Sequence, residues 1–285
     1  MANILIGYDN LIDEALVSDG SWIAALPLGN IQDRELGLVA RSNGLALGAT
    51  KFVVDLQVFN VVRVIDIVRH TLSRDARFRI RSSTVSDFSA VGVDSGWQDV
   101  WPRVYPFGSL PWGAPNWWDG RYTDKEIGRQ KTELIYILPE ESTDQFWLFE
   151  FDDQANAAGF IDIGRVFIGP AWQPAMNASF GWSLGVEDTS EIEVTLSGAE
   201  SADERTRRRV LNFSTDWMEE DEALARAFEI QRGSGITREV VVVQNPDDTV
   251  HLARRAFLAR LGKLDPIVNP YVQLNRTSWQ ARELL

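Results

Sequence analysis

Residues 58–81, VFNVVRVIDIVRHTLSRDARFRIR, predict two successive strands of a β-sandwich. Residues 58–68 are almost continuously apolar and rich in β-branched side chains, which is typical of a strand buried in a sandwich. In residues 76–81 apolar side chains alternate with arginines, so Phe78 and Ile80 are expected to point inward and the arginines outward. The stretch therefore predicts one buried strand followed by a strand with a solvated face.

Further strand segments lie on both sides of this stretch and extend the same architecture. Each is a short apolar or alternating run bounded by turn-forming residues, and no segment before residue 170 has a convincing helical period. Many short strands without helices predict a mainly β fold built on an antiparallel sandwich. The segments are 4–6, 51–56, 132–138, 146–151 and 160–168.

The segment Gly96–Tyr122, GWQDVWPRVYPFGSLPWGAPNWWDGRY, is expected to be a long loop, because Gly and Pro interrupt every short apolar run. It holds five of the chain's eleven tryptophans, and loops of this length are usually functional or folded on themselves. One interpretation is that the Trp rings are buried on the sandwich and their indole N–H groups bind backbone carbonyls. The other is a contact surface for a sugar or a neighbouring protein, since Trp and Tyr provide area at low entropy cost.

After residue 170 the pattern changes, and a second unit is expected. The segment Pro170–Pro174 marks the boundary. The best helix of the chain is predicted at residues 216–232, because Asp216 and Glu219 have capping-box spacing and Gly233 stands where a C′ glycine should. Strands are predicted at 191–196, 206–213 and 238–243, and also at 251–261, where the pattern is ambiguous between strand and helix.

Composition excludes several classes of function. The chain has no cysteine and only His70 and His251, which excludes disulfides and nearly excludes a His-based triad or a multi-histidine metal site. Its formal net charge of −13 is expected to repel nucleic acid. No window of eighteen residues is apolar and uncharged, and the start MANILIGYDNLIDE lacks a basic region, so neither a membrane span nor a signal peptide is predicted.

The order of the segments resembles the discoidin, or factor 5/8 C-type, galactose-binding-like jelly roll. The matching pieces are SWIAALPLGNIQD (21–33), ARS (40–42), TKFVVDL (50–56), VVRVIDIVRHTLSRDARFRIRSS (61–83) and FWLFEFDDQANAAGFIDIGRVFIG (146–169). Related segments recur in tail proteins of long-tailed bacteriophages, often with an aromatic loop like VDSGWQDVWP (93–102). The resemblance implies a jelly-roll domain over residues 1–172 with an aromatic-rich insertion at 92–131.

Residues 173–285 resemble the tube-like belt domain of phage distal tail proteins. The pieces that carry this resemblance are FEIQRGSGITREVVVVQNPDD (228–248), RRAFLARLGKLDPI (254–267) and SWQARELL (278–285). The resemblance implies a tail-tube-like β-barrel or sandwich flanked by one α-helix, 216–232. Distal tail proteins usually place the belt domain first and a carbohydrate-module-like domain second, whereas this chain has the reverse order.

The two resemblances together imply a structural protein of a phage tail tip or baseplate, and not an enzyme. It would form a threefold or sixfold ring with other copies of itself and would contact the tail tube, hub and fibres. Phage DNA would pass through the ring without specific binding. The protein would be made in the host cytoplasm and would reside in the virion. The alternative is a carbohydrate-binding adhesin or receptor-binding module that contacts a host surface glycan through the jelly roll and its Trp-rich loop. A glycoside hydrolase is a third hypothesis, although no motif marks a pair of carboxylates.

Contact with a carbohydrate or a partner is predicted for five residues of the aromatic loop, Trp112, Trp117, Trp118, Asp119 and Tyr122. Asp119 beside two tryptophans resembles a sugar site, although a carboxylate that caps the following turn is the simpler interpretation.

In the second unit, ring contacts are predicted at Leu224 and Phe228, on the apolar face of helix 216–232, and the same two residues are expected to pack the helix on the outside of the barrel. No catalytic residue, cofactor or metal site is predicted. Asp152 and Asp153 could hold a cation, but a turn with Asx hydrogen bonds explains them more simply.

Overall fold

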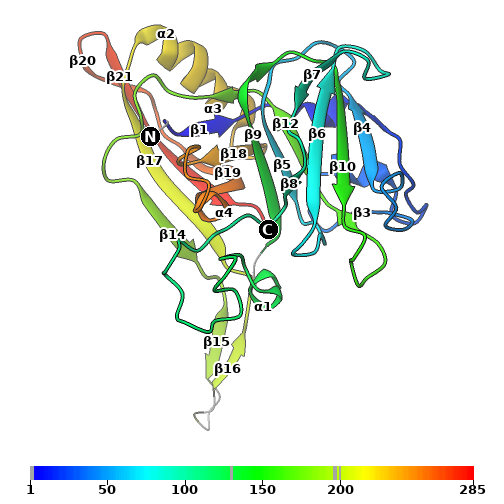
Figure 1. The fold of residues 1–285 in the computed structure, drawn as a ribbon. Coiled ribbons are helices and arrows are strands. Elements are labelled where there is room, and N and C mark those ends of the chain that lie inside the picture. Colours follow the sequence, from blue (N-terminus) through cyan, green and yellow to red (C-terminus); the bar gives the residue numbers. More distant parts are fainter. Residues whose placement is uncertain (1–2, 129–130, 195–197, 199) are drawn as a thin grey trace.

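The computed structural model describes residues 3–128, 131–194, 198 and 200–285. Figure 1 shows two β units packed side by side, with one long helical segment on the outside of the second unit. The predicted fold class is confirmed: the chain is mainly β, with an antiparallel sandwich and a second β unit flanked by a helix.

The first unit is a sandwich of two antiparallel sheets. The outer sheet has the spatial order β2–β4–β10–β6–β7 with β8 beside β6, and the inner sheet has the order β12–β5–β9. The outer strands are β2 (Leu16–Ser18), β4 (Lys51–Asp55), β6 (Arg77–Ser83), β7 (Val91–Asp94), β8 (Gln98–Asp99) and β10 (Phe146–Asp152). The inner strands are β5 (Val62–Val68), β9 (Glu133–Ser142) and β12 (Val166–Gly169). The small pair β3 (Ala40–Arg41) and β11 (Asp162–Ile163) and the 3₁₀ turns η1 (Leu11–Glu14) and η2 (Leu28–Gln32) complete the unit.

The second unit is built on an eight-stranded antiparallel sheet. Its spatial order is β13–β1–β18–β19–β21–β17–β14, with β20 paired to β21. The strands are β1 (Leu5–Gly7), β13 (Ala171–Trp172), β14 (Ser183–Glu187), β17 (Arg208–Met218), β18 (Glu239–Val243), β19 (Ala256–Leu264), β20 (Val268–Tyr271) and β21 (Leu274–Glu283). A separate hairpin of β15 (Glu191–Val194) and β16 (Glu200–Asp203) projects from the end of this unit (Figure 1).

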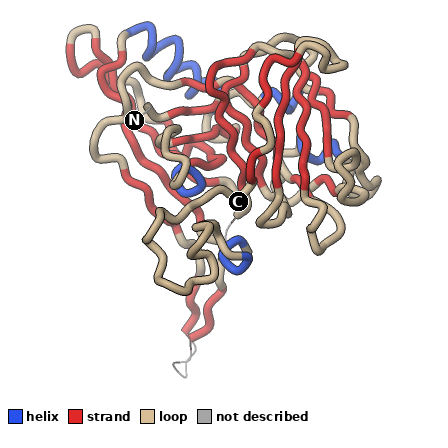
Figure 2. Tube along the Cα trace, viewed as in Figure 1, coloured by secondary structure: helices blue, strands red, loops and turns tan. Residues whose placement is uncertain are grey.

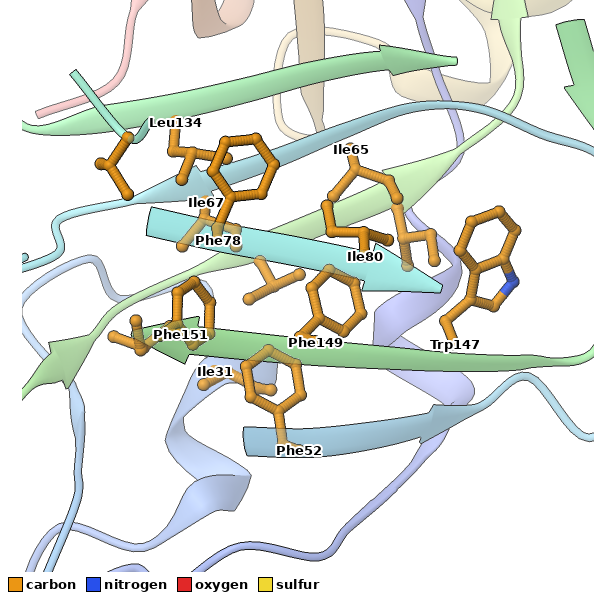
Figure 3. Close-up of a cluster of buried hydrophobic side chains, with 14 of the residues drawn as sticks. Ile31, Phe52, Ile65, Ile67, Phe78, Ile80, Leu134, Trp147, Phe149 and Phe151 are labelled. Carbon is orange, nitrogen blue, oxygen red and sulfur yellow. The ribbon is translucent and has the colours of Figure 1, made fainter. Parts of the chain in front are cut away.

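Strand β6 shows the alternation that the sequence predicts. Phe78 and Ile80 lie in the sandwich core, shown in Figure 3, with Phe52, Trp147 and Phe149. The three arginines point outward and form ion pairs with carboxylates of neighbouring strands: Arg77 with Asp152, Arg79 with Asp94, and Arg81 with Glu150.

The inner sheet is buried on both faces, which explains the near-continuous apolar run in β5. Ile65 and Ile67 face the sandwich core, whereas Val64 and Val68 face the sheet of the second unit and contact a cluster that includes Val241. The molecule therefore has four layers: the outer sheet, the inner sheet, the sheet of the second unit and its helix. A strand between two other layers has no solvated face, so it needs no polar alternation.

The first strand departs from the predicted division of the chain at residue 172. Strand β1 pairs with β18 and β13, so residues 5–7 belong to the sheet of the second unit. The apolar run at residues 4–6 predicts a strand but carries no information about the partner of that strand. The partner, β18, lies more than 230 residues away in the sequence. Whether residues 1–172 and 173–285 fold as separate domains stays a prediction.

The predicted helix begins later and ends later than expected. Strand β17 continues to Met218, so Asp216 lies in a strand and cannot cap a helix; this part of the prediction was wrong. The helical segment comprises α2 (Glu220–Glu222), a π-helical stretch (Ala223–Phe228) and α3 (Glu229–Ser234). It packs on the sheet through Ala223, Ala227 and Ile230. Its C-terminal glycine is Gly235, with φ 53°, and Gly233 lies inside the helix.

Two predicted strands also differ from the structure. The segment 251–261 divides into a short helix α4 (Leu252–Arg255) and strand β19, which resolves its ambiguous pattern. The strand predicted at 191–196 is observed as β15 over Glu191–Val194, and residues 195 and 196 lie outside the described part of the chain.

Candidate contact site on the aromatic loop

The base of the aromatic loop is part of the sandwich core. Trp101 and Tyr122 are buried and meet edge to face, with ring centroids 6.3 Å apart. The indole Nε1 of Trp101 donates to the carbonyl oxygen of Leu72 at 3.2 Å. At this end of the loop, buried rings and satisfied indole groups are found as the first interpretation predicts.

A network of backbone bonds holds the rest of the loop in shape. The N–H groups of Val104 and Tyr105 both donate to Gly120 O at 2.9 Å, and the N–H of Gly120 donates to Asn116 O at 2.8 Å. Gly120 has φ 62°, and a Cβ there would lie 2.8 Å from the carbonyl oxygen of Tyr105. Only glycine fits a site that combines this conformation with so close an approach. After the two-residue strand β8, the loop runs without further strands to the short helix α1 (Asp124–Ile127), and Figure 2 shows it as a long tan segment.

The end of the loop is fixed by a capping box at α1. The Thr123 side chain accepts from the N–H of Glu126, and the Glu126 carboxylate accepts from the N–H of Thr123. The hydroxyl of Tyr105 also donates to Glu126. This hydrogen bond is the main reason why the pKa of Glu126 is lowered and the pKa of Tyr105 is raised. The loop is therefore ordered before any partner binds.

Four aromatic side chains at the tip of the loop form an exposed cluster, which we call the aromatic tip. Phe107, Trp112 and Trp118 are exposed by 81%, 80% and 78%, and Trp117 lies half-buried among them. The ring of Trp117 is 4.6 Å from those of both Trp112 and Trp118, in edge-to-face contacts. The loop thus combines both interpretations: its base is core, and its tip presents apolar ring surface to solvent. The sequence analysis predicted the three tryptophans as contact residues but did not include Phe107.

The other two predicted contact residues have structural roles in the loop. Asp119 forms an ion pair with Arg74 and accepts from the N–H of Arg121 at 3.1 Å, so it caps the turn as the simpler interpretation holds. Tyr122 is only 6% exposed and packs between Trp101 and Tyr105. Its assignment as a contact residue is corrected: the ring is enclosed by the loop and cannot offer a face to a ligand.

Arg254 ties the loop to the second unit, a contact that sequence reasoning missed. Its Nη1 donates to Val104 O at 2.8 Å and lies 3.1 Å from His251 Nδ1. Its guanidinium stands over the rings of Tyr105 and Tyr122, 5.3 and 5.6 Å from their centroids. Because 150 residues separate Arg254 from Val104, no local signal in the sequence could have found this contact.

The two predicted ring-contact residues lie on the outer face of the helical segment. Leu224 and Phe228 are exposed by 51% and 47%, whereas the face toward the sheet consists of smaller side chains. The expectation that Leu224 and Phe228 pack the helix on the sheet is therefore corrected. They remain available for contact with another molecule.

Carboxylates do not gather into a metal-binding group in the described part of the chain. Asp153 accepts from the N–H of Ser73 at 2.8 Å and from the amide of Asn156 at 2.7 Å, which fits the predicted turn. None of the helices in the described residues has the length and apolar character needed to cross a membrane.

Comparison with known proteins finds no matching family model and no matching curated protein. Several solved structures are similar to this chain. One is CBM32-1 from a family 31 glycoside hydrolase of Clostridium perfringens, with 11% identity and a TM-score of 0.36 over 57% of this chain and 99% of that one. A second is the family 32 carbohydrate-binding module of C. perfringens NanJ in complex with galactose, with 11% identity and a TM-score of 0.36 over 59% of this chain and 99% of that one.

A third is the lectin-binding domain of lectinolysin complexed with Lewis b, with 10% identity and a TM-score of 0.37 over 57% of this chain and 96% of that one. At these identities and TM-scores, the assignment of the fold rests on the sheets described above. Those sheets place the chain in the mainly β class, with an antiparallel sandwich as its first unit.

Proposed function

We propose that this chain is a non-catalytic binding protein whose aromatic tip contacts a saccharide. The observation that carries the proposal is the exposure of Phe107, Trp112 and Trp118 on a loop whose backbone is already fixed. Large apolar rings exposed together on an ordered loop usually mark a binding surface. Their faces suit the C–H faces of a pyranose ring, and a fixed loop has little conformational entropy left to lose on binding.

The proposal is tested by truncating the tip. We expect Trp112→Ala and Trp118→Ala each to weaken saccharide binding on a glycan array without lowering the thermal unfolding temperature, because both rings are largely exposed. Trp217→Ala is the matched control: Trp217 is 49% exposed and stacks on Tyr271 in the second unit. If the control reduces binding as much as the tip variants, or if wild type binds no glycan, the proposal fails.

A second candidate function is that of a self-associating structural subunit, as in the ring of a phage tail tip. The observation that favours it is the apolar surface of the second unit: Phe180 is fully exposed, Val272 is 87% exposed, and Ile192 on the projecting hairpin is 67% exposed. An isolated two-stranded hairpin is marginally stable in water, so a partner that covers it would stabilise it. In such a ring the acidic excess of the chain would partly face the channel and let DNA pass.

This candidate is tested by the mass of the particle in solution. A ring-former is expected to give a closed threefold or sixfold assembly at micromolar concentration. Phe228→Asp should reduce the mass to that of a monomer that stays folded, since Phe228 is half-exposed. A wild-type chain that stays monomeric at every concentration would remove this candidate and leave the saccharide proposal in place.

A further inference from the structure

A groove of about 750 Å³ lies between the base of the aromatic loop and the strands β14 and β17. Trp101 lines it from the loop, Leu184 and Val186 from β14, and Arg254 from helix α4. The groove is therefore built from both units of the molecule, next to the loop that carries the aromatic tip. The two functions proposed above, for the aromatic tip and for the exposed apolar surface of the second unit, give this groove no role.

The lining of the groove is rich in cationic side chains, although the molecule is acidic. Six cationic side chains line it against three carboxylates, whereas the whole chain carries a formal net charge of −13. The cations are Lys131, Arg205, Arg207, Arg208, Arg209 and Arg254, and the carboxylates are Glu133, Glu204 and Glu283. A cation at such a groove attracts an anionic ligand where no carboxylate neutralises it, because local charges act over short distances in salt solution.

Most of these cations are already paired with carboxylates. Arg209 is held by Glu133 and Glu283, at 2.7 and 2.6 Å. Arg205, Arg207 and Arg208 have ion pairs with Glu191, Asp188 and Glu187. These four side chains are therefore neutralised by their partners and are not free to grip a ligand directly.

Arg254 is different, because part of its guanidinium is unused. Only Nη1 has hydrogen-bond contacts, with Val104 and His251, and no carboxylate pairs with Arg254 among the residues that the structure describes. Its Nε and Nη2 have no protein partner in the same described residues, and neither atom is buried without a partner. These two nitrogens form the edge of the guanidinium that chelates a carboxylate with two parallel hydrogen bonds. The rings of Tyr105 and Tyr122 fix the plane of that edge.

We propose that this groove binds the carboxylate of an acidic saccharide, with Arg254 as the residue that grips it through Nε and Nη2. The inference rests on the proposed saccharide contact at the aromatic tip and deepens it by naming the class of ligand: a glycan that carries a uronic or sialic acid. Sugar rings contact the aromatic tip, and the acid group of the same chain occupies the groove. A saccharide fits better than an acidic peptide because the groove adjoins a loop rich in exposed indole rings.

The test compares matched acidic and neutral probes by titration calorimetry. The probes are sialyllactose with lactose, and a hyaluronan tetrasaccharide with its carboxyl-reduced form. We expect wild type to bind at least one acidic probe about tenfold or more tightly than its neutral partner, as a bidentate ion pair predicts. Arg254→Gln should abolish this preference, measured as the ratio of the affinities for the acidic and the neutral probe, because the substitution also removes the contact with Val104 that anchors the loop. Arg232→Gln is the control, since Arg232 is an exposed arginine on α3, outside the groove.

A second pair of variants leaves the anchor of the loop intact. Thr206 is exposed and lines the groove, so Thr206→Glu adds a negative charge there, whereas Thr206→Gln adds a side chain of the same size without charge. We expect the Glu variant to lose acidic-probe binding and the Gln variant to retain it. Equal affinity for acidic and neutral probes, or an equal loss of both in Arg254→Gln, would overturn this inference alone. A wild-type chain that binds no saccharide would overturn both this inference and the proposed function. A wild-type chain that binds a hexaglutamate peptide more tightly than any saccharide would overturn the inference and the saccharide as the class of ligand.

Discussion

Arg165 is fully buried where the two units meet. Its Nε donates to Glu239 Oε1 at 2.8 Å, Nη1 donates to the carbonyl oxygen of Gln32, and Nη2 pairs with Asp13. A buried charge is tolerated only when its partners replace the water that it has lost. This cluster joins the residue that precedes β12 of the inner sheet to β18 of the second unit, so it depends on how the two units pack.

We expect Arg165→Met to lower the free energy of unfolding by about 3–5 kcal/mol, because the buried carboxylate of Glu239 loses its charged partner. Urea denaturation followed by Trp fluorescence measures the change. The control is Arg34→Met, which removes the other partner of Asp13 but has a half-exposed side chain, so about 1 kcal/mol or less is expected. A loss of similar size in both variants would contradict the role given to Arg165.

His70 is buried against Trp101, and burial lowers its pKa to about 3. In the unfolded chain the histidine has its ordinary pKa near 6.5. At a pH between about 3 and 6.5 the unfolded chain therefore binds a proton at His70, whereas the folded chain does not. His70 therefore has no effect of this kind on stability above pH 6.5, and it destabilises the folded chain increasingly as the pH falls from 6.5 toward 3. Neither ring nitrogen has a hydrogen-bond partner in the described part of the chain.

We expect His70→Phe to lose less stability on acidification than wild type. The unfolding free energies at pH 7 and pH 5, from urea titrations, should fall by about 2 kcal/mol less in the variant. The two proteins are compared over the same pH step, so the other titrating groups cancel. An identical pH dependence in both would show that His70 is protonated in the folded chain.

The helical segment of the second unit shows how one glycine can end an element and another can weaken it. Gly233 lies inside α3 with open space around it, whereas Gly235 ends the helix at φ 53° and ψ −147°. Residues other than glycine rarely adopt the backbone conformation of Gly235. A glycine inside a helix, such as Gly233, has an entropic cost on folding.

The two positions provide a matched pair of substitutions. We expect Gly233→Ala to raise the unfolding free energy by about 0.5–1 kcal/mol and Gly235→Ala to lower it by about 1 kcal/mol or more. Thermal unfolding followed by circular dichroism distinguishes them by the sign of the shift. Opposite signs to those expected would place the end of the helix at Gly233, as the sequence pattern alone suggests.

At the scale of the molecule, the two units share one interior. Strand β1 contributes Ile6 to the cluster under the helix, to which the preceding residue Ile4 is added, whereas Leu5 of β1 lies in the cluster between the units. Val64 and Phe167 of the sandwich lie in that same second cluster with Val241 of β18. Apolar surface is thus buried across the boundary at residue 172, so each half leaves part of its core exposed when it is alone.

We expect the fragment 173–285 to lack a cooperative unfolding transition, because it lacks β1 and the inner sheet that covers Val241 and Leu258. The full chain should unfold in one transition, with coincident circular dichroism and fluorescence curves. Two separate transitions, or a fragment as stable as the full chain, would instead support independent domains at the predicted boundary.

Local patterns in the sequence were sufficient for the class of the fold and for most of the longer strands of the sandwich, whereas β14 and β21 of the second unit were not predicted. Alternation in residues 76–81 and continuous burial in residues 62–68 each depend on which faces of one strand meet water, and this is visible in the order of residues. The aromatic loop could also be located, because Gly and Pro exclude regular structure.

Only the tertiary structure decided what those elements contact. It placed Tyr122 in the core and Trp112 in solvent on one loop, paired β1 with β18, and brought Arg254 to the base of the loop. Each of these outcomes depends on segments far apart in the chain, whose approach is determined by the packing of whole layers. Residue type and spacing therefore predict an aromatic contact loop, whereas the groove beside it arises only when the two units meet.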